Sequence, residues 1–513
     1  MLVKVFGAAV QGIEATTITI EVNTDRGIKF FLVGMPDEAV KESHERIISA
    51  LKHNNLKFPS CQIIINMAPA DVRKEGASYD LPLAIGILAA NESIKSDNLS
   101  RYIIMGELSL DGSLQPIKGV LPIAIQAKRA GFEGLILPQV NAQEAAVTEG
   151  LNVYGVENIQ QVVDFFNEKS ILTPAIAHPQ DIIRVDNDII DFDFEDVKGQ
   201  ENVKRAFEVA AAGSHNLVLV GPPGAGKTMM AKRLPGILPP LSLSESLETT
   251  QVHSVAGLMA RNACLVTKRP FRAPHHSISQ VALVGGGKNP KPGEISLAHN
   301  GVLFLDELPE FKRSALEVLR QPLEDRRMTI SRINYTVEYP CSFMMVASMN
   351  PCPCGMYNHP TKECSCSPTQ VQNYLNRISG PLMDRIDIQI EIVPVPYSDM
   401  AGNRLAESSA QIRERVIRAR RIQEQRFANE PGIYCNAQMT PRLLRTHAQP
   451  SPEGQEMLRI AMEKMGLSAR AYDRILKVAR TIADLAESPT IERSHIAEAI
   501  SYRTLDRGNW ATR

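Results

Sequence analysis

The stretch 217–234, LVLVGPPGAGKTMMAKRL, joins a short apolar strand to a glycine-rich turn and the start of a helix. That context gives weight to its match to a phosphate-binding loop. The glycines of the turn are Gly221, Gly224 and Gly226. They let backbone N–H groups face phosphate oxygens at a helix N-terminus. Lys227 is predicted to reach the β- and γ-phosphates, and the Thr228 hydroxyl to ligate Mg²⁺. The alternative is an ordinary glycine turn.

Two further apolar strands end in polar side chains. In GVLFLDELPEF, 301–311, the apolar strand ends in two carboxylates, Asp306 and Glu307. Asp306 is expected to hold Mg²⁺ through water, and Glu307 to polarise the attacking water. CSFMMVASMN, 341–350, ends at Asn350, whose amide suits the positioning of that water beside the γ-phosphate. For Asn350 the alternative is a simple strand cap.

Arginines follow in two places. ISGPLMDRIDIQIEI presents Arg385 before another strand, where it could reach a neighbouring subunit's γ-phosphate as an arginine finger. LSARAYDRILKVAR offers Arg470 and Arg474, one helical turn apart, as a second phosphate sensor. The alternatives are a local salt bridge for Arg385 and a solvated basic helix face for the other two.

Four of the eight cysteines fall within fifteen residues, at Cys352, Cys354, Cys364 and Cys366. Four thiolates suit tetrahedral Zn²⁺, and a closed site of this kind would be structural. The C-x-C spacing is tighter than that of the usual knuckle, and Pro353 and Gly355 favour the turn that would bring the thiols together. Unliganded thiols, or a mixed site that uses His359, are the alternatives.

The composition limits the number of domains, the location and the kinds of partner that we expect. At 513 residues, with 44% hydrophobic and 22% charged residues, the chain exceeds one ordinary domain. Its first residues show no signal peptide, and the run LPLAIGILAA is too short to cross a bilayer. We therefore expect a soluble, cytoplasmic protein without a disulfide framework. The net charge of −1 requires any contact with nucleic acid to come from a local basic surface.

The patterns divide the chain into four parts. Residues 1–170 mix strands and helices, 171–191 read as a linker, 192–396 form a second α/β unit, and 397–513 are helical. The expected fold class is α/β, with an N-terminal α+β domain, a phosphate-loop core and a helical lid.

The order of these motifs resembles the AAA+ ATPases, and specifically the magnesium-chelatase-like family of ComM and YifB proteins. NPCPCG at 350–355 and NMAPADVRKEGASYDLPLAIGIL at 66–88 are more particular to that family than the phosphate-loop motifs are. The resemblance covers nearly the whole chain. It implies a ring, usually a hexamer, with ATP between subunits. It also implies a DNA motor that migrates branches in homologous recombination and natural transformation.

DNA contacts are expected on two loops. The first, within FRAPHHSISQVALVGGGKNPKPGEISLAHNG, carries Lys288 and Lys291. The second, EDRRMTISRINYTVEYP, is expected to form a hairpin with Arg327 and Arg332. Such basic loops could line a ring pore and follow a phosphate backbone. Ordinary surface loops are the alternative, and the adjacent His275 and His276 are expected to be structural.

The N-terminal part also resembles the Lon-protease domain, which has a ribosomal-protein-S5-like fold. Ser78 in KEGASYD lies near the position of the Lon nucleophile. Active Lon enzymes read PIGGLK where this chain reads PIKGVL, so Leu121 replaces the lysine base and Lys118 comes three positions early. The missing base therefore argues against proteolysis.

Three functions remain open on the sequence alone. The leading one is an ATP-driven DNA branch-migration helicase. The second is a chelatase-like ATPase subunit that remodels a protein partner, and the third is an ATP-dependent Lon-like protease.

Overall fold

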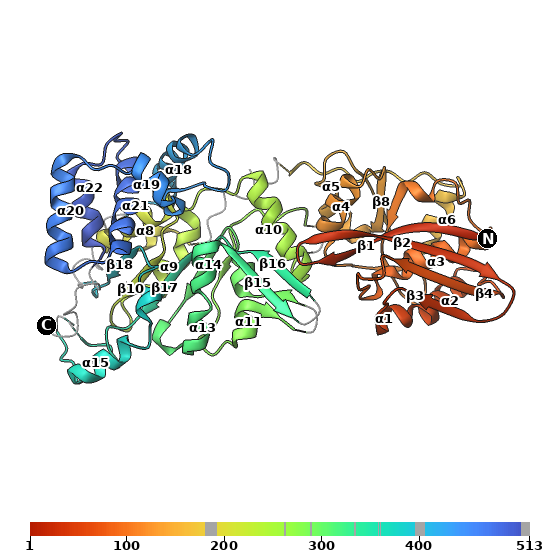
Figure 1. Ribbon diagram of the computed structural model, residues 1–513, viewed down its shortest axis with the longest axis horizontal. Coiled ribbons are helices and arrows are strands. Elements are labelled where there is room, and N and C mark those ends of the chain that lie inside the picture. Colours follow the sequence, from red (N-terminus) through yellow and green to blue (C-terminus); the bar gives the residue numbers. More distant parts are fainter. Residues whose placement is uncertain are drawn as a thin grey trace.

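The computed structural model describes residues 1–179, 192–260, 263–287, 290–332, 335–357, 359, 361–395 and 406–503. The molecule is elongated, with the N-terminal sheet at one end, the C-terminal helices at the other and the phosphate-loop core between them (Figure 1). None of the described helices combines the length and apolar character needed to cross a bilayer. The predicted α/β fold class is confirmed. The predicted linker lies outside the described residues from residue 180 onward.

Seven strands form the N-terminal sheet, in the order β3-β4-β2-β1-β5-β8-β9. The strands β1, β2 and β4 are antiparallel, and the remaining neighbours pair in parallel. Their bounds are β1 Leu2–Gln11, β2 Glu14–Asp25, β3 Phe30–Val33, β4 Gln62–Ala68, β5 Tyr102–Ile104, β8 Gly134–Pro138 and β9 Asn152–Val156. A small hairpin pairs β6 Glu107–Leu108 with β7 Leu114–Gln115.

The helices of this part are α1 Glu38–Lys41, α2 Ser43–His53, α3 Asp80–Ala90, α4 Val120–Arg129, α5 Ala142–Ala146 and α6 Ile159–Phe166. Every residue of α3 is buried, because its sequence DLPLAIGILAA is apolar on all sides and packs on β1 and β2. The buried negative charge of Asp80, at the start of α3, is compensated by two hydrogen bonds from the guanidinium of Arg46 on α2.

The core contains a fully parallel five-stranded sheet in the order β11-β14-β17-β10-β18. Its strands are β10 Leu217–Val220, β11 Phe271–Arg272, β14 Val302–Leu305, β17 Met344–Met349 and β18 Ile388–Glu391. The central strands β10, β14 and β17 are buried throughout, as expected of strands covered on both faces. The surrounding helices are α8 Glu201–Gly213, α9 Lys227–Ile237, α10 Leu243–Ala256, α11 Gln280–Val284, α12 Glu294–Leu297, α13 Arg313–Glu317, α14 Arg320–Asp325, α15 Pro368–Leu375 and α16 Gly380–Met383.

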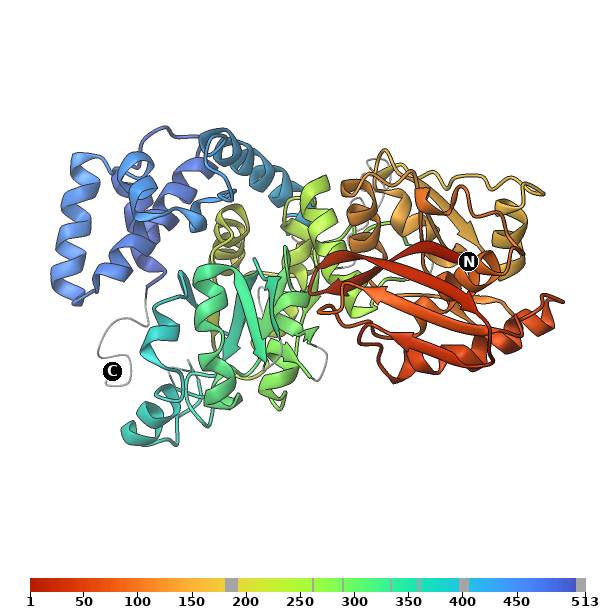
Figure 2. The same cartoon turned by 45° about the vertical axis from the view of Figure 1, so that its right-hand side comes forward.

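Two hairpins are added to this core. The first pairs β12 Gly285–Gly286 with β13 Lys291–Pro292. The second, which the sequence predicted, pairs β15 Arg327–Arg332 with β16 Tyr335–Pro340. The turn between β1 and β2 reaches this second hairpin (Figure 2), and a Cβ on Gly12 would lie 2.7 Å from Val337 Cγ1.

The C-terminal part is helical. Its elements are α18 Ser409–Arg426, α19 Pro441–His447, α20 Pro452–Met465, α21 Ala469–Leu485 and α22 Arg493–Ser501. The apolar sides of α18 and α21 share one hydrophobic cluster with α8 and the core sheet, which fixes the lid to the core.

Candidate ATP site

The phosphate loop follows β10 directly and leads into α9. Gly224 and Gly226 have φ angles of 79° and 87°, a region that favours glycine. Gly221 is needed for space, because a Cβ there would lie 2.4 Å from the Ile392 carbonyl oxygen. Within the described part of the chain no side chain caps the N-terminus of α9, which leaves its backbone N–H groups available to an anion.

Lys227 is held by oxygens of the same site. Its Nζ donates to the carbonyls of Gly221 at 2.6 Å and Pro222 at 2.9 Å, and to Asn350 Oδ1 at 3.0 Å. Burial lowers the pKa of Lys227, while the carboxylates of Asp306 and Glu307 act in the opposite direction. The end of β17 thus lies beside the lysine of the phosphate loop.

The end of β14 completes a set of oxygen ligands. Thr228 Oγ1 donates to Asp306 Oδ2 at 2.8 Å, and Ser348 Oγ donates to Asp306 Oδ1. A hydroxyl and a carboxylate in contact beside a phosphate loop are the hard oxygen ligands that Mg²⁺ prefers, so these residues fit the ion. Ser348, which orients the carboxylate, was not singled out in the sequence.

Glu307 has a left-handed backbone, with φ of 55°, and its side chain is half exposed. His276 Nδ1 lies 3.3 Å from Glu307 Oε2. From the sequence we expected His276 to be structural, and its proximity to Glu307 was not predicted. No local pattern could have indicated it, because the two residues are 31 positions apart.

Arg385 lies three residues before β18, at the amino-terminal ends of the parallel strands, which we call the amino edge of the sheet. The phosphate loop lies at their carboxyl-terminal ends. Its backbone carbonyl accepts from Asn216, which directly precedes β10. A four-residue strand is about 13 Å long, so Arg385 is separated from the phosphate loop of its own chain by the length of the strands. Its guanidinium pairs with Glu324 Oε1 at 2.5 Å and donates to the Pro381 carbonyl at 2.6 Å.

Arg470 and Arg474 also lie at this amino edge. Arg470 is exposed, 3.8 Å from Asp384 Oδ2. Arg474 Nη1 donates to the buried Asp387 Oδ1 at 2.7 Å. Burial alone would raise the pKa of Asp387, but Arg474 and His215 lower it far below its usual range. Arg474 therefore has a structural partner, whereas Arg470 is accessible.

The four cysteines converge. Their sulfurs all lie within 4.8 Å of one another, with Cys352, Cys354 and Cys364 at mutual distances of 3.4 to 3.6 Å. Sulfurs about 2.3 Å from one tetrahedral zinc stand about 3.8 Å apart, so the group fits zinc without large movement. Partial burial raises the pKa of Cys354, but hydrogen bonds from the Met356 amide and other donors lower it to about 6.

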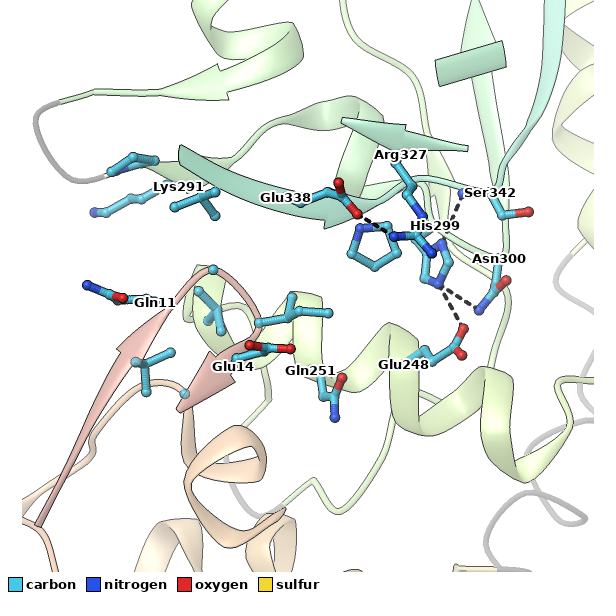
Figure 3. Close-up of a pocket in the computed structure, with 18 of the residues that line it drawn as sticks. Gln11, Glu14, Glu248, Gln251, Lys291, His299, Asn300, Arg327, Glu338 and Ser342 are labelled. Atoms are coloured by element: carbon cyan, nitrogen blue, oxygen red, sulfur yellow. Dashed lines mark hydrogen bonds and ion pairs between the residues drawn. The ribbon is translucent and has the colours of Figure 1, made fainter. Parts of the chain in front are cut away.

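A large cavity, about 1440 Å³, lies between the N-terminal part and the amino edge of the core sheet. Figure 3 shows Gln11 and Glu14 on one side and Lys291 and Glu338 on the other. Arg327 also lines it and pairs with Glu338 at 2.6 Å. Among the described residues, eight Lys or Arg and nine Asp or Glu side chains line the cavity, so this lining is not electropositive. Of the other residues expected to contact DNA, Lys288 lies outside the described residues, and Arg332 is described only by its pairing opposite Tyr335.

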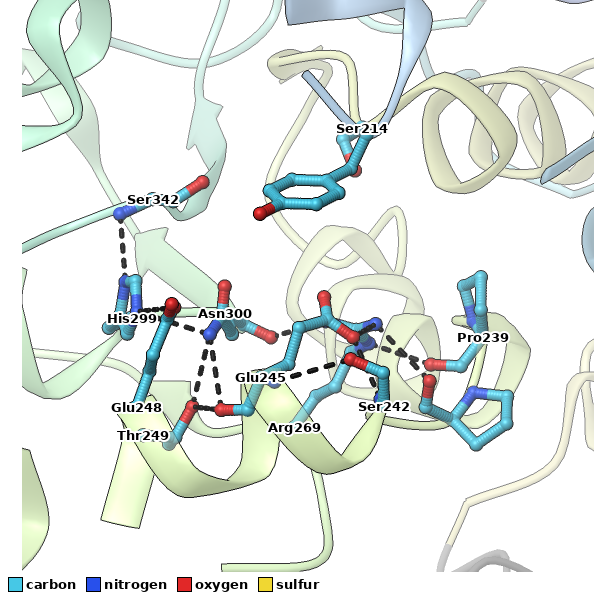
Figure 4. Close-up of polar contacts among 12 residues, drawn as sticks. Ser214, Pro239, Ser242, Glu245, Glu248, Thr249, Arg269, His299, Asn300 and Ser342 are labelled. Atoms are coloured by element: carbon cyan, nitrogen blue, oxygen red, sulfur yellow. Dashed lines mark hydrogen bonds and ion pairs between the residues drawn. The ribbon is translucent and has the colours of Figure 1, made fainter. Parts of the chain in front are cut away.

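Helix α10 borders this cavity and joins both parts of the molecule. Glu245 forms a bidentate pair with Arg269, both contacts at 3.0 Å, and Arg269 donates to the Asn300 carbonyl (Figure 4). At the other end of α10, the Gly119 amide of the N-terminal part donates to the Ser254 carbonyl at 3.1 Å. The helix therefore contacts both the N-terminal part and the core.

Ser78 and Lys118 line the N-terminal side of the same cavity. Leu121 is fully buried and packs in an apolar cluster with Leu265 and Leu247 of the core. Leu121, which the sequence was expected to place where Lon proteases carry their lysine base, is therefore part of a contact between the two parts of this chain.

Three sequence models of one family match the chain. The model for subunit ChlI of magnesium chelatase matches residues 193–400, a second ChlI model matches 20–141, and the ChlI C-terminal model matches 406–503. Competence protein ComM of Haemophilus influenzae is 44% identical over 511 residues, covering 99% of this chain and 98% of that protein. The YifB protein of Salmonella typhimurium is 43% identical, covering 97% and 96%. Lon protease 2 of Bacillus subtilis is 32% identical over 125 residues, or 24% of this chain.

Proposed function

The chain belongs to the magnesium-chelatase ChlI-like family of AAA+ ATPases, and from this membership we propose that it is an ATP-driven ring motor that acts on DNA. Its role would be branch migration during homologous recombination and natural transformation. Full-length similarity to a protein named for competence carries the DNA part of this proposal. The hydrogen-bonded site formed by Lys227, Asn350, Thr228 and Asp306 supports the ATPase part.

In hydrolysis, Lys227 exchanges its loop carbonyls and Asn350 for the β- and γ-phosphate oxygens. Asn350 is then free to orient the attacking water, and Glu307 polarises that water. Thr228 and Asp306 would hold Mg²⁺, which neutralises charge on the β- and γ-phosphates when bound. The half-exposed position of Glu307 leaves its carboxylate accessible to water.

The two arginines at the amino edge act on a neighbour in this proposal. Arg385 and Arg470 lie on the far side of the sheet from their own phosphate loop, so a second subunit must supply the γ-phosphate that they contact. A head-to-tail contact of this kind closes into a ring, and we propose a hexamer. Arg385 would exchange Glu324 for the phosphate.

DNA would contact the two hairpins through Lys288, Lys291, Arg327 and Arg332. Arg327 and Lys291 come from different hairpins and line the same cavity, which supports one contact surface shared by both hairpins. In the free chain Arg327 pairs with Glu338, and DNA phosphates would have to replace that carboxylate. The cysteine site would hold a structural Zn²⁺.

The test is ATP-dependent strand displacement from labelled forked and four-way DNA, with Glu307→Gln as the matched control. We expect displacement by the wild type and none by the variant, which keeps the size and charge pattern of the site apart from one carboxylate. Absence of displacement, together with an ATPase rate that no DNA changes, would contradict the DNA motor.

The second candidate is a chelatase-like ATPase that remodels a protein partner. The matches to all three ChlI models favour it. It predicts an ATPase rate insensitive to DNA and raised by a protein partner. A Lon-like protease is disfavoured by the burial of Leu121, and degradation of casein would be the observation that restores it.

A further inference from the structure

The four cysteines belong to a loop, residues 351–367, that joins the end of β17 to α15; we call it the cysteine loop. Its interior is small: Cys352 and Val371 are buried, and the residues packed on them are the other three cysteines, Tyr357 and Leu375. So few apolar contacts do not stabilise a segment of this length without a covalent or metal link. These four cysteines, all among the described residues, are free thiols.

The cysteine loop touches the phosphate loop. Gly355, with φ of 77°, lies so close to Pro223 that a Cβ on it would be 2.6 Å from Pro223 Cδ and 3.0 Å from Cγ. The backbone of one loop is therefore in van der Waals contact with a side chain of the other. A shift of Gly355 toward Pro223 must therefore displace that side chain.

The same loop also fixes Asn350. Only Pro351 separates Asn350 from the buried Cys352. The buried Tyr374, on α15, interacts through its hydroxyl with the backbone of Asn350. Asn350 Oδ1 in turn accepts from Lys227. The cysteine cluster thus has two short connections to the nucleotide site, one through Pro223 and one through Asn350.

We propose that a zinc-type ion held by the four cysteines positions Asn350 and the phosphate loop, so that metal loading controls nucleotide affinity and hydrolysis. The inference rests on the ATPase proposed above. Loss of the metal would free the cysteine loop, release the packing on Pro223 and leave Asn350 without a fixed backbone. Tyr374 and Gly355 are positioning residues in this arrangement, and neither contacts the reacting atoms.

The test uses the full chain, with metal content, affinity for a fluorescent ATP analogue and hydrolysis measured on the same samples. Metal is removed with a mercurial reagent and chelator, and Zn²⁺ or Cd²⁺ is returned; thiolate-to-Cd²⁺ absorption reports the four sulfurs independently of activity. We expect one metal per chain and nucleotide affinity about tenfold lower after removal, restored by Zn²⁺. Cys364→Ser should lose both metal and affinity. Cys61→Ser and Cys264→Ser, which change cysteines outside the cluster, should lose neither.

Gly355→Ala separates local coupling from general unfolding, because it leaves all four thiols in place and adds a methyl group against Pro223. We expect full metal content with lowered nucleotide affinity. Metal removal that leaves nucleotide affinity unchanged would overturn the inference while the ATPase stands. A zinc-loaded wild type that binds no ATP would overturn the inference together with the proposed ATPase.

Discussion

At the scale of single residues, Lys227 carries the largest predicted effect. Lys227→Ala removes the cation that would replace its three present oxygen contacts with phosphate oxygens. Affinity for ATP should fall at least about a hundredfold, since a charge-assisted hydrogen bond in a partly buried site is lost. Binding of a fluorescent nucleotide measures this. Lys232→Ala, an exposed lysine on the same helix, is the control and should bind normally.

His276 is a second residue whose effect can be measured. The Nδ1 atom of its imidazole lies 3.3 Å from one oxygen of Glu307, the place where the attacking water would bind. His276→Ala should therefore raise kcat without DNA by about twofold to fivefold, with KM little changed. Steady-state ATPase assays decide it. A loss of activity as large as that of Glu307→Gln would show that His276 orients the carboxylate instead.

At the scale of elements, α21 is tied to the start of β18 by Arg474 and the buried Asp387. Asp387→Asn leaves Arg474 without its charged partner and should lower the free energy of unfolding by about 3 kcal/mol at pH 7. Thermal melting followed by circular dichroism compares the two proteins.

The pair of Arg474 and Asp387 also makes the stability of the fold depend on pH. The folded-state pKa of Asp387 lies below the unfolded value of about 3.9, so the unfolded chain takes up the proton first as the pH falls. The stabilisation is complete above about pH 4 and is lost progressively below it. The melting difference between wild type and Asp387→Asn should therefore shrink below about pH 4. A constant difference would mean that the variant acts through packing.

At the scale of the whole molecule, the sheet separates the two halves of the catalytic machinery, so subunit mixing is the decisive experiment. Lys227→Ala and Arg385→Ala should each be inactive alone, since one lacks the phosphate lysine and the other the finger. In a random equal mixture, half of the sites keep Lys227 and half of their neighbours keep Arg385. About a quarter of the wild-type activity should therefore return if the interface is head-to-tail.

The control for this mixture is the double variant Lys227→Ala/Arg385→Ala, which should restore nothing when mixed with either single variant. If the mixture of single variants stays inactive while both still assemble, the assignment of Arg385 to a neighbouring site is wrong.

The sequence alone predicted the α/β class, the phosphate loop, the carboxylates at the end of β14 and the cluster of four cysteines. These follow from short-range rules. Backbone geometry fixes the spacing of glycines and lysine in one turn, and parallel strands bring their polar carboxyl ends to one edge. Thiols within fifteen residues can meet without any knowledge of the remaining chain.

Only the tertiary structure decided which edge of the sheet each arginine occupies, that His276 faces Glu307, that Gly355 presses on Pro223 and that Leu121 is buried against the core. These contacts join segments from about 30 to more than 130 positions apart. They depend on strand order and on how α10 seats the N-terminal sheet against the core, and no local pattern of residues encodes either one.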